Sequence, residues 1–252
     1  MAWDIDLSGK VALVSGATRG IGRAIALAMS RAGADVIGLA RSSEDLAVLG
    51  SEVAEGGRAF YAQTADLAEV ETIGDVVRSA WERAGGIDIL VNAAGVIVRH
   101  DPPDVTAEDW DAVFAVNARG SFFLTQAIGT RMVEGSGGAV VNVASIAGEV
   151  VTRAPVSYQA SKAALIQMTR ALAVRWAPKV RVNAVGPGYI RTSLNTVWLD
   201  VEENRRYVEG NTPLRRIGTP DDVVGAVVFL ASPAASYITG QHLRIDGGWS
   251  AL

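Results

Sequence analysis

Short apolar runs alternate with longer helical patterns along this chain, and this alternation constrains the fold more than any other feature. The apolar runs are rich in β-branched residues and bounded by Gly, Asp or Asn, which is typical of strands. The expected strands are 11–15, 35–40, 59–63, 87–92, 139–144, 180–185 and 242–245. The expected helices are 20–32, 44–55, 69–84, 106–134, 157–176 and 220–231. Strands joined through helices run parallel, so the order predicts an α/β fold with a doubly wound parallel sheet and helices on both faces.

Two of the expected helices begin at recognisable polar residues. Thr106 and Thr219 are predicted N-caps, with Asp109 and Asp222 three residues further on. Pro220 stands where the first helical position is expected, and its fixed φ suits that position.

The segment 189–214 breaks the alternation, because it is long and has only a weak helical pattern. Connections of this kind often form lids or binding loops. Trp198, Leu199 and Val201 would give it an apolar inner surface. We therefore expect 189–214 to act as a substrate lid.

The composition excludes several classes of protein. The chain has 252 residues, a net charge of −4 and no cysteine. An acidic balance argues against nucleic-acid binding, and the lack of cysteine excludes disulfides and thiolate metal sites. No apolar run approaches the ~20 residues of a membrane span, and the first residues lack a signal-peptide pattern. We expect a soluble, cytoplasmic protein, a single domain over 1–252, with no metal, membrane or nucleic-acid partner.

A glycine-rich turn, SGATRGIG at 15–22, follows the first expected strand and opens the first helix. Gly16, Gly20 and Gly22 leave the backbone close to the helix N-terminus, where free N–H groups and the helix dipole favour a phosphate. Their spacing, G-x-x-x-G-x-G, differs from the G-x-G-x-x-G of the usual dinucleotide fingerprint. The three glycines could form a plain tight turn, but their place between strand and helix favours a cofactor site.

The end of the second strand indicates which dinucleotide would bind. An acid there suits the ribose 2′-OH of NAD, whereas an arginine suits the 2′-phosphate of NADP. The strand ends at Ala40 and Arg41, and no acid appears until Glu44. Arg41 and Arg19 could each form charge-assisted contacts with a phosphate. NADP is therefore favoured, with NAD as the alternative if both arginines face solvent.

A tyrosine, a lysine and a serine are the candidates for chemistry. Tyr158 and Lys162 are four residues apart in an expected helix and so share one face. An ammonium beside a phenol favours the phenolate and lowers the tyrosine pKa, which makes tyrosine a usable acid/base for a carbonyl or a secondary alcohol. Ser145 ends a strand at the carboxyl edge, where parallel sheets bind ligands, and its hydroxyl could hold the reacting oxygen.

Together these motifs resemble those of the short-chain dehydrogenase/reductase superfamily over essentially the whole chain. The resemblance rests on the SGATRGIG turn, Asp66-Leu67, Asn92-Ala93-Ala94-Gly95, Asn117, Ser145, Tyr158-x-x-x-Lys162 and Gly186-Pro187-Gly188. Ser145 precedes Tyr158 by thirteen residues, an interval that the family commonly shows. The family fold implies a Rossmann-like parallel sheet of seven strands with three helices on each side.

The resemblance implies four catalytic residues. Tyr158 would be the general acid/base, and Lys162 would bind the nicotinamide ribose and lower the Tyr158 pKa. Ser145 would orient the substrate carbonyl. Asn117 would hold a water in a proton relay behind Lys162, although it could instead satisfy a backbone kink.

The resemblance also implies a cofactor site drawn from the whole length of the chain. Asp66 would bind the adenine amino group beside the Leu67 backbone, or could instead cap a helix. Residues 92–95 would line the adenosine-ribose side, and Ala93 replaces a usual asparagine, which could weaken local hydrogen bonding. The implied cofactor-binding residues are Gly16, Thr18, Arg19, Gly20, Ile21, Gly22, Arg41, Asp66, Leu67, Asn92, Ala93, Ala94, Gly95, Tyr158, Lys162, Pro187, Gly188, Ile190 and Thr192.

The implied activity is an NAD(P)-dependent interconversion of a carbonyl and a secondary alcohol by hydride transfer. Similarity favours a sugar acid or polyol as substrate, and Arg99, His100 and Arg153 could meet an anionic one unless they point to solvent. The alternatives are a 3-oxoacyl-carrier-protein reductase and a non-catalytic dinucleotide-binding regulator. An acidic carrier protein should meet basic residues near the site entrance, and 132–138 contains none. A regulator would be expected to lack Tyr158 or Lys162.

The helices 106–134 and 157–176 carry apolar residues on more than one face, which is more than a helix on a sheet needs. The chain also ends in the apolar tail 247–252. The family resemblance implies a homotetramer, with one interface built from these two helices and another from the last helix and strand. Alternatively, the lid segment 189–214 could cover the surplus apolar surface within one subunit.

Overall fold

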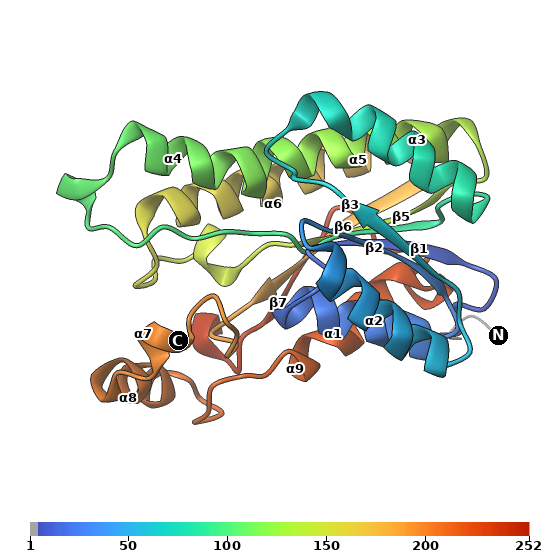
Figure 1. The fold of residues 1–252 in the computed structure, drawn as a ribbon. Helices are drawn as coiled ribbons and strands as arrows, with labels where there is room; N and C mark the ends of the chain where they lie inside the picture. The colour runs from blue at the N-terminus through green and yellow to red at the C-terminus, as the bar shows by residue number, and fades with distance from the viewer. Residues whose placement is uncertain (1–4, 252) are drawn as a thin grey trace.

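The computed structural model describes residues 5–251, which form seven parallel strands in the order β3-β2-β1-β4-β5-β6-β7 (Figure 1). The strands are β1 Val11–Ser15, β2 Asp35–Ala40, β3 Phe60–Thr64, β4 Ile89–Asn92, β5 Gly138–Val143, β6 Val180–Pro187 and β7 His242–Ile245. β1, β4 and β5 lie in the middle and are apolar and buried along most of their length, as expected of strands covered on both faces. The predicted doubly wound parallel sheet is confirmed.

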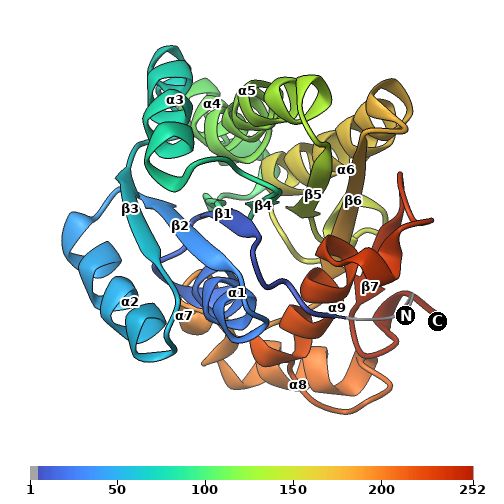
Figure 2. The same cartoon turned by 90° about the vertical axis from the view of Figure 1, so that its right-hand side faces the viewer.

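Helices cover both faces of the sheet (Figure 2). α1, α2 and α9 pack on one face of the sheet, with α1 and α2 over β1 to β3 and α9 over β5 and β6. α3, α5 and α6 pack on the other face. The helices are α1 Gly20–Arg31, α2 Ser43–Glu55, α3 Ile73–Ala84, α4 Ala107–Phe114, α5 Ser121–Glu134, α6 Val156–Trp176, α7 Thr196–Leu199, α8 Glu202–Asn211 and α9 Asp221–Ala231. Within residues 5–251, none of these helices is both long and apolar enough to cross a membrane.

The predicted single helix over 106–134 is wrong in its middle. A π-helical stretch, Ala115–Gly120, separates α4 from α5 and inserts a wide turn. A Cβ on Gly120 would lie 2.2 Å from the Leu67 carbonyl oxygen, so the chain approaches a neighbouring loop there more closely than a side chain would permit. Nothing in the local apolar spacing marks this contact, because it depends on a residue more than fifty positions earlier.

The two predicted caps have different outcomes. Thr106 caps α4 as expected, since its hydroxyl accepts from the Asp109 N–H and the Asp109 carboxylate accepts from the Thr106 N–H. Thr219 does not cap α9, because Pro220 occupies the N-cap position rather than the first helical position. Both the N–H and the hydroxyl of Thr219 donate to the Asp222 carboxylate instead.

Small shifts separate the other predicted bounds from the observed ones. β4 begins at Ile89, two residues later than expected, and the Asp88 carboxylate just before it binds Lys10 and the Val11 N–H. β6 continues to Pro187 because its last residues pair with β7. The predicted lid segment contains the short helices α7 and α8.

Candidate active site

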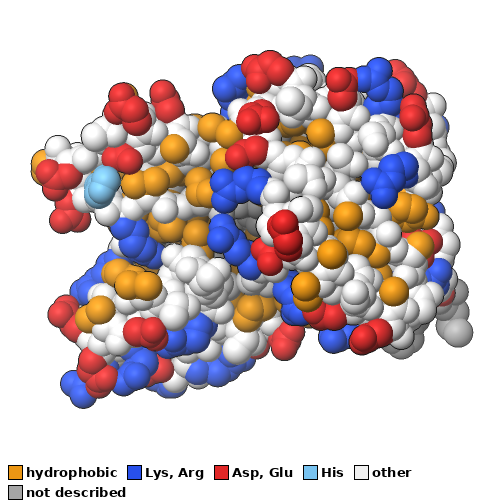
Figure 3. Space-filling model, viewed as in Figure 1, with side chains coloured by type: hydrophobic (Ala, Val, Ile, Leu, Met, Phe, Trp, Pro, Cys, Tyr) orange, Lys and Arg blue, Asp and Glu red, His pale blue; other side chains and the backbone are white. Residues whose placement is uncertain are grey.

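A cavity of about 310 Å³ opens at the carboxyl edge of the sheet. It is walled by the turn after β1, by the segments that follow β2 to β6, and by α6. Basic side chains flank a hollow on the face drawn in Figure 3. The cavity brings together every predicted catalytic and cofactor residue except Asn92 and Asn117.

The glycine turn has the geometry of a phosphate cradle. Gly16 has a φ of +67°, and a Cβ there would lie 2.8 Å from the Ala94 Cα. A Cβ on Gly22 would lie 2.2 Å from the Gly16 carbonyl oxygen, so the turn closes only on glycine. The first turn of α1 carries no acidic residue that would repel an anion. The residues present therefore fit a dinucleotide, whose pyrophosphate would face the free N–H groups of α1.

Arg41 and Asp66 face each other across the adenosine end of the cavity. The Arg41 Nη1 lies 3.7 Å from the Asp66 Oδ2, and Arg41 remains mostly exposed. Asp66 Oδ1 accepts a hydrogen bond from the Ala68 N–H at 2.9 Å, which closes a local turn, whereas the N-cap of the following 3-10 helix is Glu69 and not Asp66. Asp66 thus holds its own turn and still lines the cavity.

Ser145, Tyr158 and Lys162 meet at the other end of the cavity. Ser145 follows β5, and its hydroxyl hydrogen-bonds to the Tyr158 side chain and accepts from the Ala147 N–H at 3.1 Å. Lys162 is buried, and its Nζ donates to the Val143 carbonyl oxygen at 2.8 Å. The helical spacing and the strand end therefore bring these three side chains into one site.

Burial and neighbouring groups shift the pKa values of Tyr158 and Lys162. Burial raises the pKa of Tyr158, and the effects that oppose it are the Ser145 hydrogen bond and the charge of Arg99. The Lys162 ammonium donates to the Val143 carbonyl and lies 5.7 Å from the Tyr158 ring centre. Burial also lowers the pKa of Lys162 to about 8. The expected lowering of the Tyr158 pKa by Lys162 stays a prediction.

Asn117 lies behind the cavity wall, within the π-helical stretch. Its Oδ1 accepts from the Val96 N–H at 2.8 Å, and its Nδ2 donates to the Val96 carbonyl and to Ser161. A Cβ on Gly95 would lie within 3.6 Å of both Asn117 Oδ1 and Lys162 Nζ, so the two residues approach each other behind Gly95. Asn117 thus fixes the backbone after β4, and its role in a water relay stays a prediction.

Asn92 also lies behind the wall rather than in it. Its Nδ2 donates to Thr125 and to Asn142, each at 2.7 Å, and Asn142 donates onward to Thr169 at 2.8 Å. This buried ladder ties β4 and β5 to α5 and α6. Contact with the adenosine ribose is therefore available to Ala93, Ala94 and Gly95, which line the cavity, and not to the Asn92 side chain.

Ser15 is a functional residue that the sequence reasoning missed. Its hydroxyl accepts from the N–H groups of Ala93 and Ala94 at 3.2 and 3.3 Å. This contact holds the segment in which Ala93 replaces the usual asparagine, so the backbone remains hydrogen-bonded there. The sequence signal was weak, because a serine at a strand end has many other uses.

Arg99 and Arg153 do not simply point to solvent. The Arg99 guanidinium lies 5.6 Å from the Trp198 ring centre, and the Arg153 guanidinium lies 3.7 Å from that of Tyr207. Trp198 and Tyr207 belong to α7 and α8, so both arginines dock the lid segment on the body of the protein. His100 instead pairs with Asp109 at 2.8 Å on the outside.

Known proteins resemble this chain over nearly its whole length. The family model described as enoyl-(acyl carrier protein) reductase matches residues 16–250. The chain is 38% identical to 2-dehydro-3-deoxy-D-gluconate 5-dehydrogenase of Escherichia coli, with 97% of each chain covered. It is 40% identical to galactitol 2-dehydrogenase of Cereibacter sphaeroides, with 96% of each covered, and 39% identical to the 3-oxoacyl-[acyl-carrier-protein] reductase of Aquifex aeolicus, covering 97% and 99%.

A solved gluconate 5-dehydrogenase of Burkholderia cenocepacia, in complex with NADP and tartrate, superimposes with a TM-score of 0.95 at 32% identity, covering 99% of this chain and 98% of that one. The chain belongs to the short-chain dehydrogenase/reductase superfamily.

This short-chain dehydrogenase/reductase is an NAD(P)-dependent oxidoreductase that interconverts a carbonyl and a secondary alcohol. The nicotinamide cofactor, when bound, supplies or accepts the hydride. The Tyr158 phenol hydrogen-bonds to Ser145, and its predicted role is to hold at its Oη the proton that the substrate oxygen gains or loses. Burial of the site strengthens these contacts, because little water competes for them.

Tyr158→Phe should collapse turnover and leave cofactor binding intact. The substitution removes the proton donor but keeps the ring that packs in the cavity, and loss of a general acid/base costs typically 10²–10⁴-fold. Tyr237→Phe is the matched control, because Tyr237 is fully exposed. Steady-state kinetics and a fluorescence titration with NADPH measure the two quantities. Near wild-type turnover in Tyr158→Phe would show that another group carries the proton.

Proposed function

We propose that this enzyme acts on a sugar acid, with NADP as its cofactor. The observation that carries the substrate class is Arg99, an exposed residue that lies close enough to Tyr158 and Tyr189 to interact with both electrostatically. A guanidinium beside the proton donor provides a fixed positive charge for a substrate carboxylate. Polyols, which are the substrates of other relatives, are uncharged and would form no ion pair with this guanidinium.

Arg99 is available to a substrate anion. Burial lowers its pKa, and its contact within residues 5–251 is the face of Trp198, with no carboxylate forming an ion pair. Arg153, by contrast, faces both Tyr207 and Glu203. An arginine without an anionic partner favours binding of a carboxylate. The tartrate in the relative from Burkholderia cenocepacia is a hydroxy acid, which supports the same class.

Arg99→Met should separate sugar acids from polyols. Loss of a charge-assisted contact costs roughly 1.5–3 kcal/mol, so we expect kcat/KM for aldonic and ketoaldonic acids to fall about ten- to a hundredfold. Any loss that comes through Tyr158 would affect neutral polyols equally, so the ratio between the two substrate classes is the decisive quantity. Arg206→Met, at an exposed position on α8, serves as the control. Equal losses on acids and polyols would contradict a carboxylate contact.

Arg41 and Arg19 support NADP over NAD. Both line the adenosine end of the cavity, and no acid stands at the end of β2 to take a ribose 2′-OH. Solved relatives contain NADP. The Asp66 carboxylate beside Arg41 would orient the guanidinium, which stays exposed enough to reach a 2′-phosphate.

Arg41→Asp should reverse the cofactor preference. The wild type is expected to show a lower KM for NADPH than for NADH, and the variant the opposite, because an aspartate repels the phosphate and can accept from a 2′-OH. The change should be about ten- to a hundredfold in the ratio of the two kcat/KM values. Arg78→Asp, an exposed reversal on α3, controls for net charge. A wild type that binds NADH more tightly would refute the preference.

A carrier-protein reductase is the second candidate, because the matching family model and the relative from Aquifex aeolicus both carry carrier-protein names. Arg170 on α6 pairs with Glu149 at 3.3 Å, so it is not a free basic residue for an acidic carrier. A substrate panel that includes a 3-oxoacyl thioester alongside sugar acids separates the two candidates.

We also propose a homotetramer, on the basis of apolar side chains that remain exposed. Trp110 on α4 and Phe123 on α5 are 37% and 36% exposed, and Val174 on α6 is 81% exposed. The lid segment does not cover them: α7 and α8 lie below the sheet in Figure 1, and α4 and α5 lie above it. Exposed apolar surface of this kind usually marks an interface.

The apolar C-terminal tail was expected to form part of a second interface, but one of its apolar side chains is already packed within the subunit. Trp249 packs within its own chain, 4.9 Å from Tyr189 and 5.5 Å from Tyr207 between ring centres. The last tail residue, Leu252, lies outside the described residues.

Light scattering at micromolar concentration should give a mass near four chains of 26.4 kDa. Trp110→Lys combined with Phe123→Lys should lower the mass, because two charges in an apolar interface cannot be paired. Tyr237→Lys, at a fully exposed position, should leave it unchanged. A wild-type mass of one chain would overturn the assembly.

A further inference from the structure

A buried histidine, His242, lies close to the active site and has no part in the chemistry described above. Its side chain is 2% exposed, although it belongs to the edge strand β7. The imidazole fills the space that Gly186 leaves on β6: a Cβ there would lie 2.3 Å from the His242 Nε2. Gly186 directly precedes Pro187 and Gly188, which line the cavity.

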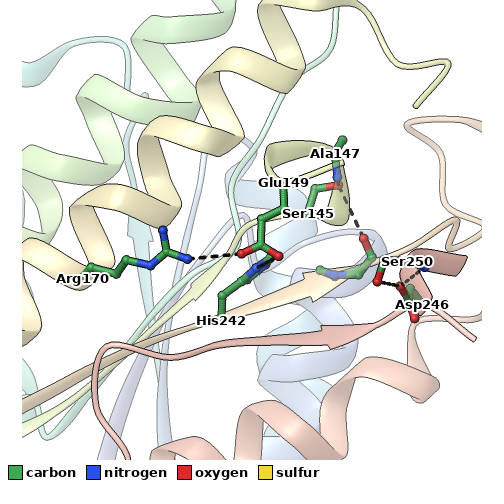
Figure 4. Close-up of polar contacts among 8 residues, drawn as sticks. Ser145, Ala147, Glu149, Arg170, His242, Asp246 and Ser250 are labelled. Carbon is green, nitrogen blue, oxygen red and sulfur yellow. Dashed lines mark hydrogen bonds and ion pairs between the residues drawn. The ribbon is translucent and has the colours of Figure 1, made fainter. Parts of the chain in front are cut away.

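A carboxylate and a guanidinium complete the cluster (Figure 4). The His242 Nδ1 lies 3.1 Å from Glu149 Oε2, and the Arg170 Nη2 lies 3.3 Å from Glu149 Oε1. Figure 4 shows His242 and Arg170 approaching Glu149 from β7 and from α6. One carboxylate thus joins the edge strand to the helix that carries the proton donor.

Glu149 is attached to the turn that carries Ser145. Residues 146–148 form a single 3-10 turn that Ser145 begins, and the Glu149 N–H donates to the Ile146 carbonyl at 2.9 Å. A Cβ on Gly148 would lie 2.8 Å from the Lys162 carbonyl carbon, so the turn rests directly on the α6 backbone. The position of Ser145 relative to Tyr158 therefore depends on how this turn is seated.

We propose that His242 is a positioning residue for hydride transfer: through Glu149 it holds the Ser145 turn against α6, and it does so as a neutral imidazole. Nδ1 lies 3.1 Å from Glu149 Oε2 without forming a regular hydrogen bond, so a proton on Nδ1 is attracted to the carboxylate by its charge. Nε2 is buried against Gly186 and has no hydrogen-bond partner among the described residues, so a second proton there would lack an acceptor. Protonation of the ring would displace it from Gly186 and disturb the adjoining Pro187 wall.

The surrounding charges act in both directions. Glu149 favours the imidazolium, whereas Arg170 on α6 and Arg244 on β7 oppose it, and Gly186 on β6, which packs against the ring, carries no charge. Burial is the largest effect and lowers the His242 pKa below its usual 6.5. A group whose folded pKa is lowered stabilises the native site above pH 6.5, and that stabilisation is lost as the pH falls through the folded pKa.

Three variants test the proposal, assayed with any alcohol or ketone that the wild type turns over, so the result does not depend on a sugar-acid substrate. His242→Leu keeps an apolar side chain but loses the contact with Glu149, and kcat should fall at least about tenfold, since small misplacements can cost ~10²-fold. The KM for NADPH should change less than about twofold, because the cofactor residues are untouched. His242→Gln retains an N–H for Glu149 and should restore most of kcat. Gln241→Leu, at the exposed neighbouring position, should behave as the wild type.

The pH dependence of kcat distinguishes a positioning role of His242 from a merely structural one, which would not change the shape of the profile. The chain has two histidines, so the imidazole signal that is missing from the NMR spectrum of His242→Gln identifies His242. That signal should titrate below pH 6.5 in the wild type, and log kcat should fall over the same range. In His242→Gln this fall of log kcat at acidic pH, the acid limb of the profile, should disappear. Wild-type kcat in His242→Leu, or an unchanged acid limb in His242→Gln, would overturn the proposal.

Discussion

Parallel pairing of the strands is the constraint on which the rest of this structure depends. Because all seven strands point the same way, their carboxyl ends share one edge. The chain builds β1, β2 and β3 outward in one direction and then places β4 on the other side of β1, so the loops after β1 and β4 diverge. The cavity lies at this edge, and residues as distant in sequence as Gly16 and Tyr158 meet there.

Hydrogen bonds between buried polar groups hold the site together, although Asn92 Oδ1 and both ring nitrogens of His242 have no partner among the described residues. Lys162 is satisfied by the Val143 carbonyl, and Asn92 and Asn142 are linked by hydrogen bonds across β4 and β5. Each of these groups would destabilise the fold if it were left without a partner. The same burial that makes them costly also raises the Tyr158 pKa and strengthens its contact with Ser145. The same contacts therefore contribute to the stability of the fold and to the properties of the site.

The proposed roles at the site fall to two groups of residues. The glycine turn, Ser145, Tyr158 and Lys162 line the cavity and are predicted to bind the cofactor and carry the chemistry. Arg99 and the His242–Glu149 contact lie outside this set, and we propose that they act on the substrate and on the Ser145 turn. Under this proposal, substrate choice and fine positioning depend on residues other than those predicted to carry the chemistry.

The sequence by itself determined what depends on local spacing. The strand and helix order, the glycine turn and the Tyr158–Lys162 pair are set by neighbours within a few residues, and the structure has them where they were expected. Only the tertiary structure decided the π-helical break, the place of Asn92 behind the wall and the docking of Arg99 on Trp198. It also decided that the Lys162 ammonium faces the Val143 carbonyl oxygen. Each of these depends on the close approach of groups from separate elements, and packing of the sheet and helices fixes that approach.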